Sequence, residues 1–194
     1  MQTVVNSFDS VSFIAGFTAT NKLYGLLEIA ALSYGYAVTT YVGQNYGAGL
    51  VPRIRSGVRA ANILALSSSL VIAAIMLLFG RPITMLFISR EDMALALDAG
   101  ETAYRYLCLM SVSLPILYLL YVYMSALQGM GNTVAPMWSA AFELTVRLSV
   151  AFAVAQIGLR SGIFWAEVGA WYGGAATQAL FYFLQMRKVK KQME

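Results

Sequence analysis

The sequence predicts an all-α fold, a polytopic bundle of transmembrane helices with about five full spans. Hydrophobic residues make up 59% of the 194 residues and charged residues only 11%, whereas a soluble domain averages about 25% charged. Four long stretches carry no charge, and a helix needs about 20 mostly apolar residues to cross a bilayer. These stretches are residues 29–52, 60–80, 106–142 and 168–186.

The first predicted helix covers about residues 12–42. About 30 residues at 1.5 Å per residue reach about 45 Å, which exceeds the ~30 Å hydrocarbon core and permits a tilt or a protruding outer end. Asn21, Lys22 and Glu28 interrupt the apolar character of this helix. Hydropathy alone would therefore start it near Leu23.

Four further helices are predicted, at about residues 57–80, 102–127, 134–156 and 163–186. A turn separates the third and fourth helices of the chain, because Gly129, Gly131 and Asn132 interrupt the uncharged stretch. Pro136 lies early in the following helix, where its missing N–H is harmless.

The basic residues predict the orientation, because cytoplasmic loops of membrane proteins are enriched in lysine and arginine. Seven of them fall on one side when the spans alternate: Arg53, Arg55, Arg59, Arg187, Lys188, Lys190 and Lys191. Four fall toward the other side: Lys22, Arg81, Arg90 and Arg160. The sequence therefore predicts a multi-pass protein of the cell membrane with a cytoplasmic C-terminus.

Two glycine-rich loops carry a family resemblance. The first is VGQNYGAG at residues 42–49, with arginines after it, and the second is LQGMGNT at residues 127–133, before a proline. This pattern resembles the multidrug and toxic compound extrusion (MATE) family. The resemblance implies two six-helix lobes and a secondary active antiporter that exports cationic or amphipathic compounds in exchange for protons or sodium ions.

On this resemblance, residues 1–194 form a single transmembrane domain that corresponds to the C-terminal lobe. The first lobe and most of the preceding helix are then expected to be absent, so the chain is expected to be a fragment or a half that pairs with a separate N-terminal lobe. Such transporters work by rocking one repeat against the other around a shared site. The third helix has Glu101 only at its outer start, which favours protons over sodium as the coupling ion.

Glu28 is the first candidate for coupling to protons or cations. An ionisable residue inside a membrane is energetically unfavourable, so each one is a functional candidate. Apolar surroundings favour the protonated form of a carboxylate, as proton coupling requires, while the charged form attracts cationic substrates. Tyr24 lies four residues earlier on the same helix face. The alternative is that Glu28 bonds a neighbouring helix and only positions it.

Glu143 and Arg147 are also spaced four residues apart, so they are expected to neutralise each other as a structural pair, or to act as a gate. Glu167 is expected near the outer start of the last span, where an acid can stay hydrated. Tyr118 and Tyr121, together with Tyr24, are predicted to line a substrate cavity, because aromatic faces hold flat cations.

The glycine-rich loops are predicted to act as hinges and an inner gate. Glycines permit the backbone to turn at the membrane surface, and amide side chains can bond carbonyls left free at a helix end. The predicted hinge residues are Gly43, Gln44, Asn45, Gly47, Gly129, Gly131 and Pro136.

Other functions have less support. An enzyme is not expected, because the chain has no histidine, one cysteine and no metal-ligand cluster, so no metal and no cofactor are expected. No nucleic-acid partner is expected either, since the net charge of +4 sits at helix ends. The expected partners are a small-molecule substrate, a coupling ion and the lipid bilayer. Two alternatives stay open: a flippase of the same superfamily for lipid-linked sugars, and a non-transporting membrane assembly protein.

Overall fold

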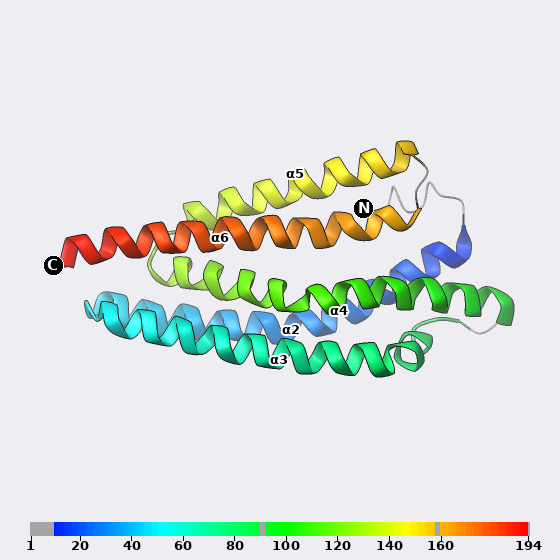
Figure 1. The fold of residues 1–194 in the computed structure, drawn as a ribbon, viewed down its shortest axis with the longest axis horizontal. Coiled ribbons are helices and arrows are strands. Elements are labelled where there is room, and N and C mark those ends of the chain that lie inside the picture. Colours follow the sequence, from blue (N-terminus) through cyan, green and yellow to red (C-terminus); the bar gives the residue numbers. More distant parts are fainter. Residues whose placement is uncertain (1–9, 90–91, 158–159, 194) are drawn as a thin grey trace. The chain divides into compact units, whose positions relative to one another are not determined.

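The computed structural model describes residues 10–89, 92–157 and 160–193. Over these residues it contains five long α-helices, one 3-10 helix and no strand, which confirms the all-α fold. Figure 1 shows their order along the chain. The elements are α2 (Val11–Gly47), α3 (Val51–Met85), α4 (Met93–Gly129), α5 (Val134–Ile157), η1 (Arg160–Ile163) and α6 (Phe164–Met193).

The helices extend beyond the apolar stretches that predicted them. α2 begins at Val11, far before Leu23, because charged side chains do not interrupt backbone hydrogen bonding and lysine and glutamate favour helices. α4 begins at Met93, where the Asp92 carboxylate accepts hydrogen bonds from the backbone N–H groups of Ala94 (3.0 Å) and Leu95 (3.1 Å). Hydropathy therefore located the helices, whereas local capping set their ends.

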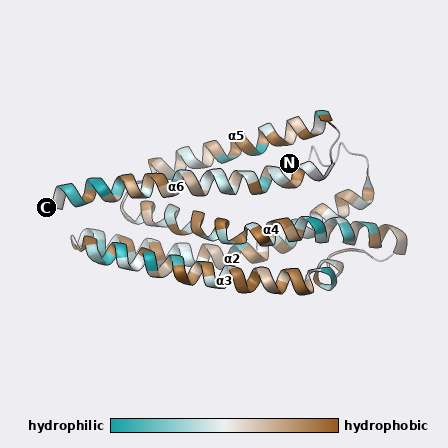
Figure 2. Cartoon of the chain, in the orientation of Figure 1, coloured by the Kyte–Doolittle hydropathy of each residue, from teal (hydrophilic) through white to brown (hydrophobic). Residues whose placement is uncertain are grey.

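Three of the described helices are long and apolar enough to cross a membrane: Val51–Met85, Met93–Gly129 and Val134–Val154. α2 and α6 are not among these three; both carry charged residues, including Lys22 and Glu28 in α2. Figure 2 shows hydrophilic residues gathered at the C-terminal end of α6 and at the start of α3. That α2 and α6 also span the membrane stays a prediction, and Arg90 lies outside the described residues.

The chain divides into two compact units, and each takes a part of every long helix. Unit 1 comprises Met1–Glu28, Leu70–Leu114 and Thr145–Gly169. Unit 2 comprises Ile29–Ser69, Pro115–Leu144 and Ala170–Glu194. The single domain over residues 1–194 stays a prediction.

Small residues let α2 and α4 approach closely in unit 1. A Cβ atom built on Gly16 would lie 2.5 Å from the carbonyl oxygen of Ala99, and the Thr20 hydroxyl donates a 2.9 Å hydrogen bond to the carbonyl of Ala103. The ring of Tyr106 in α4 stacks on the ring of Phe164 in α6, with centroids 4.4 Å apart. Close backbone contact and a hydrogen bond thus stabilise the packing of α2 on α4, as is common between helices in membranes.

In unit 2 the same two helices meet again at small residues. A Cβ atom on Gly129 would lie 2.8 Å from the Thr39 carbonyl oxygen and 2.9 Å from the Cβ of Val42. The Thr39 hydroxyl donates a 3.2 Å hydrogen bond to the carbonyl of Ser125. Gly129 therefore has a packing role in addition to any role in a hinge.

Candidate functional site

Tyr24 and Glu28 form a hydrogen-bonded pair on α2, within unit 1. The Tyr24 hydroxyl donates to Glu28 Oε1 at 3.0 Å, and both side chains are half-buried. The four-residue spacing thus brings the two groups together on one helix face, as predicted. Lys22, two residues before Tyr24, is exposed.

Further along α2, in unit 2, polar residues recur on one exposed face of the helix. We call Ser33, Tyr36, Thr40 and Gln44 the polar face of α2; all four are exposed. Two of these residues form hydrogen bonds to the backbone of their own helix. The Ser33 hydroxyl donates to the carbonyl of Ile29 (2.9 Å), and the Thr40 hydroxyl donates to that of Tyr36 (3.0 Å). Polar groups inside a membrane characteristically face a cavity or another helix, not lipid.

A salt bridge joins α5 and α6 in unit 1. Arg147 Nη2 lies 2.9 Å from Glu167 Oε1, and the two side chains are only 28% and 16% exposed. The expectation that Glu167 stays hydrated is therefore wrong. The two helices are antiparallel neighbours, so an acid early in α6 reaches the depth of a base in the middle of α5. The predicted pairing of Glu143 with Arg147 stays a prediction.

Glu143 lies against the backbone of α6 in unit 2. It accepts a 3.2 Å hydrogen bond from the buried hydroxyl of Ser139. A Cβ atom on Gly174 would come within 2.5 Å of Glu143 Oε1, so in this position the carboxylate occupies the space that a side chain at residue 174 would take. Gln178, one helical turn further on α6, is 1% exposed, and its Oε1 atom has no hydrogen-bond partner in the described part of the chain. The function of this polar cluster stays open.

The two predicted cavity tyrosines of α4 differ in exposure. Tyr118 is fully buried, and its ring centroid lies 6.0 Å from that of Tyr34. Tyr121 is half-buried. Contact between Tyr118 and a substrate would require the surrounding helices to move, so its role in a substrate cavity stays a prediction.

The first glycine-rich loop turns later than its predicted hinge residues. Gly43 and Gly47 are helical, and the turn after α2 is made at Gly49, whose φ is +73°. Asn45 Nδ2 donates to the Tyr41 carbonyl at 2.8 Å, as expected for an amide at a helix end. Gln44 is exposed, and among the described residues its side chain makes no such bond.

The second loop matches its prediction more closely. Gly131 has φ +77°, and the backbone N–H of Asn132 donates to the Leu127 carbonyl at 3.0 Å, which closes the end of α4. The Asn132 side chain then accepts from the N–H of Ala135 (3.1 Å) and so caps α5, with Pro136 in its first turn. The geometry fits a well-defined turn, and movement at these hinges stays a prediction.

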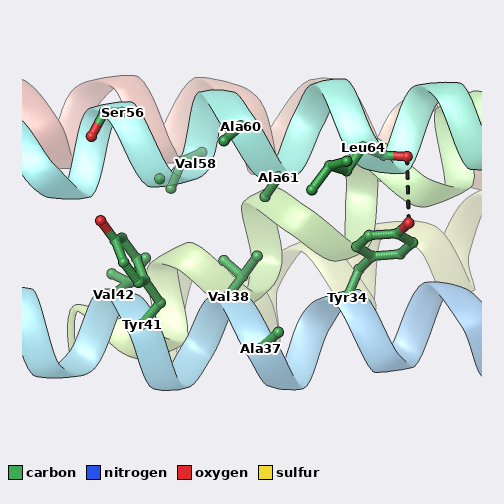
Figure 3. A pocket seen from close by; sticks show the side chains of 11 residues that line it. Tyr34, Ala37, Val38, Tyr41, Val42, Ser56, Val58, Ala60, Ala61 and Leu64 are labelled. Carbon is green, nitrogen blue, oxygen red and sulfur yellow. Dashed lines mark hydrogen bonds between the residues drawn. The ribbon is translucent and has the colours of Figure 1, made fainter.

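A groove that the sequence did not predict lies between α2 and α3 in unit 2. Its volume is about 560 Å³, and Figure 3 shows the side chains that line it. The Tyr34 hydroxyl closes one end with hydrogen bonds to Ser68 Oγ (2.6 Å) and to the Leu64 carbonyl (3.4 Å). Ala37, Ala60 and Ala61 leave the space open. The small residues Gly57, Ala60 and Ala61 at the start of α3 were the available signal in the sequence.

No group of three or more histidine, cysteine, aspartate or glutamate side chains lies close enough to hold a metal ion in the ranges that the structure describes.

Comparisons with known proteins agree with the predicted family. A family model described as MatE matches residues 1–153. A solved MOP superfamily transporter from Pyrococcus furiosus superposes with a TM-score of 0.87 at 20% identity over 97% of this chain. A solved MATE structure in complex with MaL6 gives the same TM-score at 19% identity over 98%. This chain covers 42% of each solved chain. A search of curated proteins found no match.

Proposed function

Because the chain belongs to the MatE family of membrane transporters, we propose that it is part of a secondary active antiporter that exports cationic or amphipathic compounds. We propose protons as the coupling ion and Glu28 as the coupling carboxylate. The observation that carries this assignment is the hydrogen bond from Tyr24 to Glu28, at 3.0 Å and with both side chains half-buried.

A single carboxylate can couple two opposite fluxes. When Glu28 is charged, it attracts a cationic substrate, and the Tyr24 hydroxyl stabilises that charge. When Glu28 binds a proton, its charge is lost and the attraction to a cation ends. Because the site holds either a proton or a cation, proton entry from one side drives release of the substrate on the other.

The polar face of α2 and the three tyrosines supply the rest of the proposed pathway. Ser33, Tyr36, Thr40 and Gln44 would meet a water-filled cavity, and Tyr24, Tyr118 and Tyr121 would hold flat or cationic substrates by their ring faces. The hinges at the glycine-rich loops would open and close this pathway. A flippase for lipid-linked sugars would be favoured by a basic cavity at the centre of the bundle, whereas Arg147, deep in α5, is paired with Glu167 at 2.9 Å, which supports the exporter.

We also propose the cell membrane as the location, with the arginine-rich start of α3 and the C-terminus on the cytoplasmic side. An N-terminal lobe would complete the transporter, since this chain covers 42% of the solved chains that it resembles. The coding DNA upstream of the Met1 codon tests this directly. An open frame with six or seven more apolar spans would support a two-lobe exporter, and a stop codon would require a separately encoded partner.

Replacing Glu28 with glutamine is expected to abolish proton-driven export, because glutamine keeps the shape but cannot bind a proton or carry charge. Tyr24→Phe is expected to reduce export about tenfold, since it removes one hydrogen bond to a charged group. The measurement is efflux of a cationic dye from proteoliposomes that contain the complete transporter, driven by a pH gradient.

Glu101→Gln serves as the control, because Glu101 is an acid at the exposed rim, paired with Arg81 (3.3 Å) and Arg105 (3.1 Å). It is expected to transport normally. Full activity of Glu28→Gln would remove Glu28 from the mechanism. Export that follows a sodium gradient at constant pH would show that the proposed coupling ion is wrong.

A further inference from the structure

Two arginines from different helices face one cavity in unit 2. The cavity has a volume of about 280 Å³ and lies between the start of α3 and the end of α6. Its lining residues are Arg55 of α3 and Tyr182, Phe183, Met186 and Arg187 of α6. We call it the two-arginine cavity.

The charge of this cavity is not balanced within the described part of the chain. Neither Arg55 nor Arg187 forms a salt bridge there, whereas Arg81, Arg105 and Arg147 each have an acidic partner. Both arginine residues are exposed, and two like charges that line one cavity repel each other; arginine cannot lose its proton to relieve this. An anion between the two guanidinium groups would turn the repulsion into two attractions.

The other walls of the two-arginine cavity favour an anion that carries a hydrocarbon chain. Phe183 is 54% exposed and Met186 is buried against the cavity, so part of its wall is apolar. Leu180 and Leu184, beside Phe183 on α6, are 58% and 42% exposed. These side chains give a hydrocarbon chain an apolar surface that begins at the arginines. A free phosphate ion would leave that surface without a partner.

The position along the helices also suits a lipid headgroup. Figure 2 shows that hydrophilic residues gather where α6 ends and α3 begins, whereas the middle of α3 is apolar. Phosphate groups of a bilayer lie at this transition from apolar to polar residues. Arginine binds phosphate oxygens through two parallel N–H groups, and basic pockets between membrane helices accept anionic headgroups.

We propose that the two-arginine cavity binds an anionic phospholipid, with its phosphate between Arg55 and Arg187 and an acyl chain along Phe183. The site does not depend on the transport reaction. It requires only that the chain lies in a membrane, and its ligand is a component of the bilayer itself.

Native mass spectrometry of the detergent-purified full chain tests the proposal, with phosphatidylglycerol and phosphatidylcholine as the lipids. Phosphatidylglycerol is expected to bind about tenfold more tightly, because the arginines favour net negative charge. Arg55→Gln and Arg187→Gln should each remove about that factor of ten, since each deletes a hydrogen bond between charged groups. Arg187→Lys should retain part of the binding, because lysine keeps the charge without the planar fork.

Arg53→Gln is the matched control. Arg53 lies on the same first turns of α3 and has no acidic partner among the described residues, but it does not line the two-arginine cavity. Arg53 and Arg55 are two positions apart on one α-helix, so their side chains leave it on roughly opposite faces. Binding of phosphatidylglycerol to Arg53→Gln should stay close to that of the unmodified chain.

Three results would overturn the proposal. Equal binding of phosphatidylcholine would show that the arginines do not select charge. An equal loss in Arg53→Gln would show diffuse attraction to a basic surface. Displacement of the lipid by glycerol phosphate at equal concentration would show a soluble anion site with no contribution from the acyl chain. Circular dichroism of each variant should match the unmodified chain, which separates loss of binding from loss of folding.

Discussion

Replacing Glu167 with methionine is expected to destabilise the protein by about 3 kcal/mol, because it leaves the Arg147 charge without its partner in a largely buried place. The Arg147 side chain is only 28% exposed, and its Nε atom already lacks a hydrogen-bond partner in the described residues. Arg147→Met should be similarly destabilising near neutral pH, because it leaves the Glu167 carboxylate alone. Thermal or chemical unfolding of the purified chain in detergent measures both effects.

The two single variants should differ in their dependence on pH. In Arg147→Met, Glu167 can become neutral by binding a proton, so the destabilisation should shrink as the pH falls. In Glu167→Met, Arg147 stays charged at every accessible pH, so the destabilisation should persist. A parallel pH response of the two variants would show that the unpaired charge is not the cause.

The double variant Arg147→Met with Glu167→Met is the matched control. Replacing both partners by apolar residues of similar size removes both charges of this salt bridge, and such replacements are often neutral or stabilising. The double variant is therefore expected to recover most of the stability that either single variant loses. If the losses simply add, the salt bridge at 2.9 Å contributes no coupling energy to the fold.

Replacing Gly16 with alanine is expected to destabilise the protein by about 1–3 kcal/mol, in the range typical of overpacking. The added Cβ would lie 2.5 Å from the Ala99 carbonyl oxygen and 3.1 Å from the Ala103 backbone nitrogen. These are backbone atoms of α4, so the conflict cannot be relieved by rotating a side chain. The helices must separate, which also weakens the 2.9 Å hydrogen bond from Thr20 to Ala103.

Gly25→Ala is the control for this prediction. Gly25 lies on the same helix, and an added Cβ would meet nothing within 4 Å. Alanine favours a helix over glycine by about 1 kcal/mol, so Gly25→Ala should leave the unfolding temperature unchanged or raise it. If both variants unfold at the same temperature, close contact between α2 and α4 at Gly16 does not contribute to stability.

Close helix packing at a glycine cannot be recognised from the sequence alone. Sixteen glycines are distributed over the chain, and their spacing alone does not separate those that touch another backbone from those that face open space. Gly16 and Gly25 both lie inside one helix, and their local sequence does not show which of them meets another helix. Only the position of α4 distinguishes them.

The candidate site also contains one contact that the sequence predicts and one that it does not. Tyr24 and Glu28 lie on one helix, four residues apart, so the backbone geometry of that helix alone brings them to 3.0 Å. The salt bridge of Arg147 with Glu167 could not be obtained like this, because the two residues are 20 positions apart in sequence and meet only across α5 and α6. The spacing of residues along a helix predicts contacts within that helix, but it does not predict contacts between helices.

The amino-acid sequence by itself determined the all-α fold, the order of five helices, the two glycine-rich turns and the family. Each depends on local patterns, since hydropathy, helix propensity and turn residues act over a few residues. Tertiary structure decided the burial of Tyr118, the salt bridge of Arg147 with Glu167 and the meeting of Arg55 with Arg187 at one cavity. These depend on which helix faces pack together, and in an apolar bundle most faces are equally hydrophobic, so composition does not identify the neighbour.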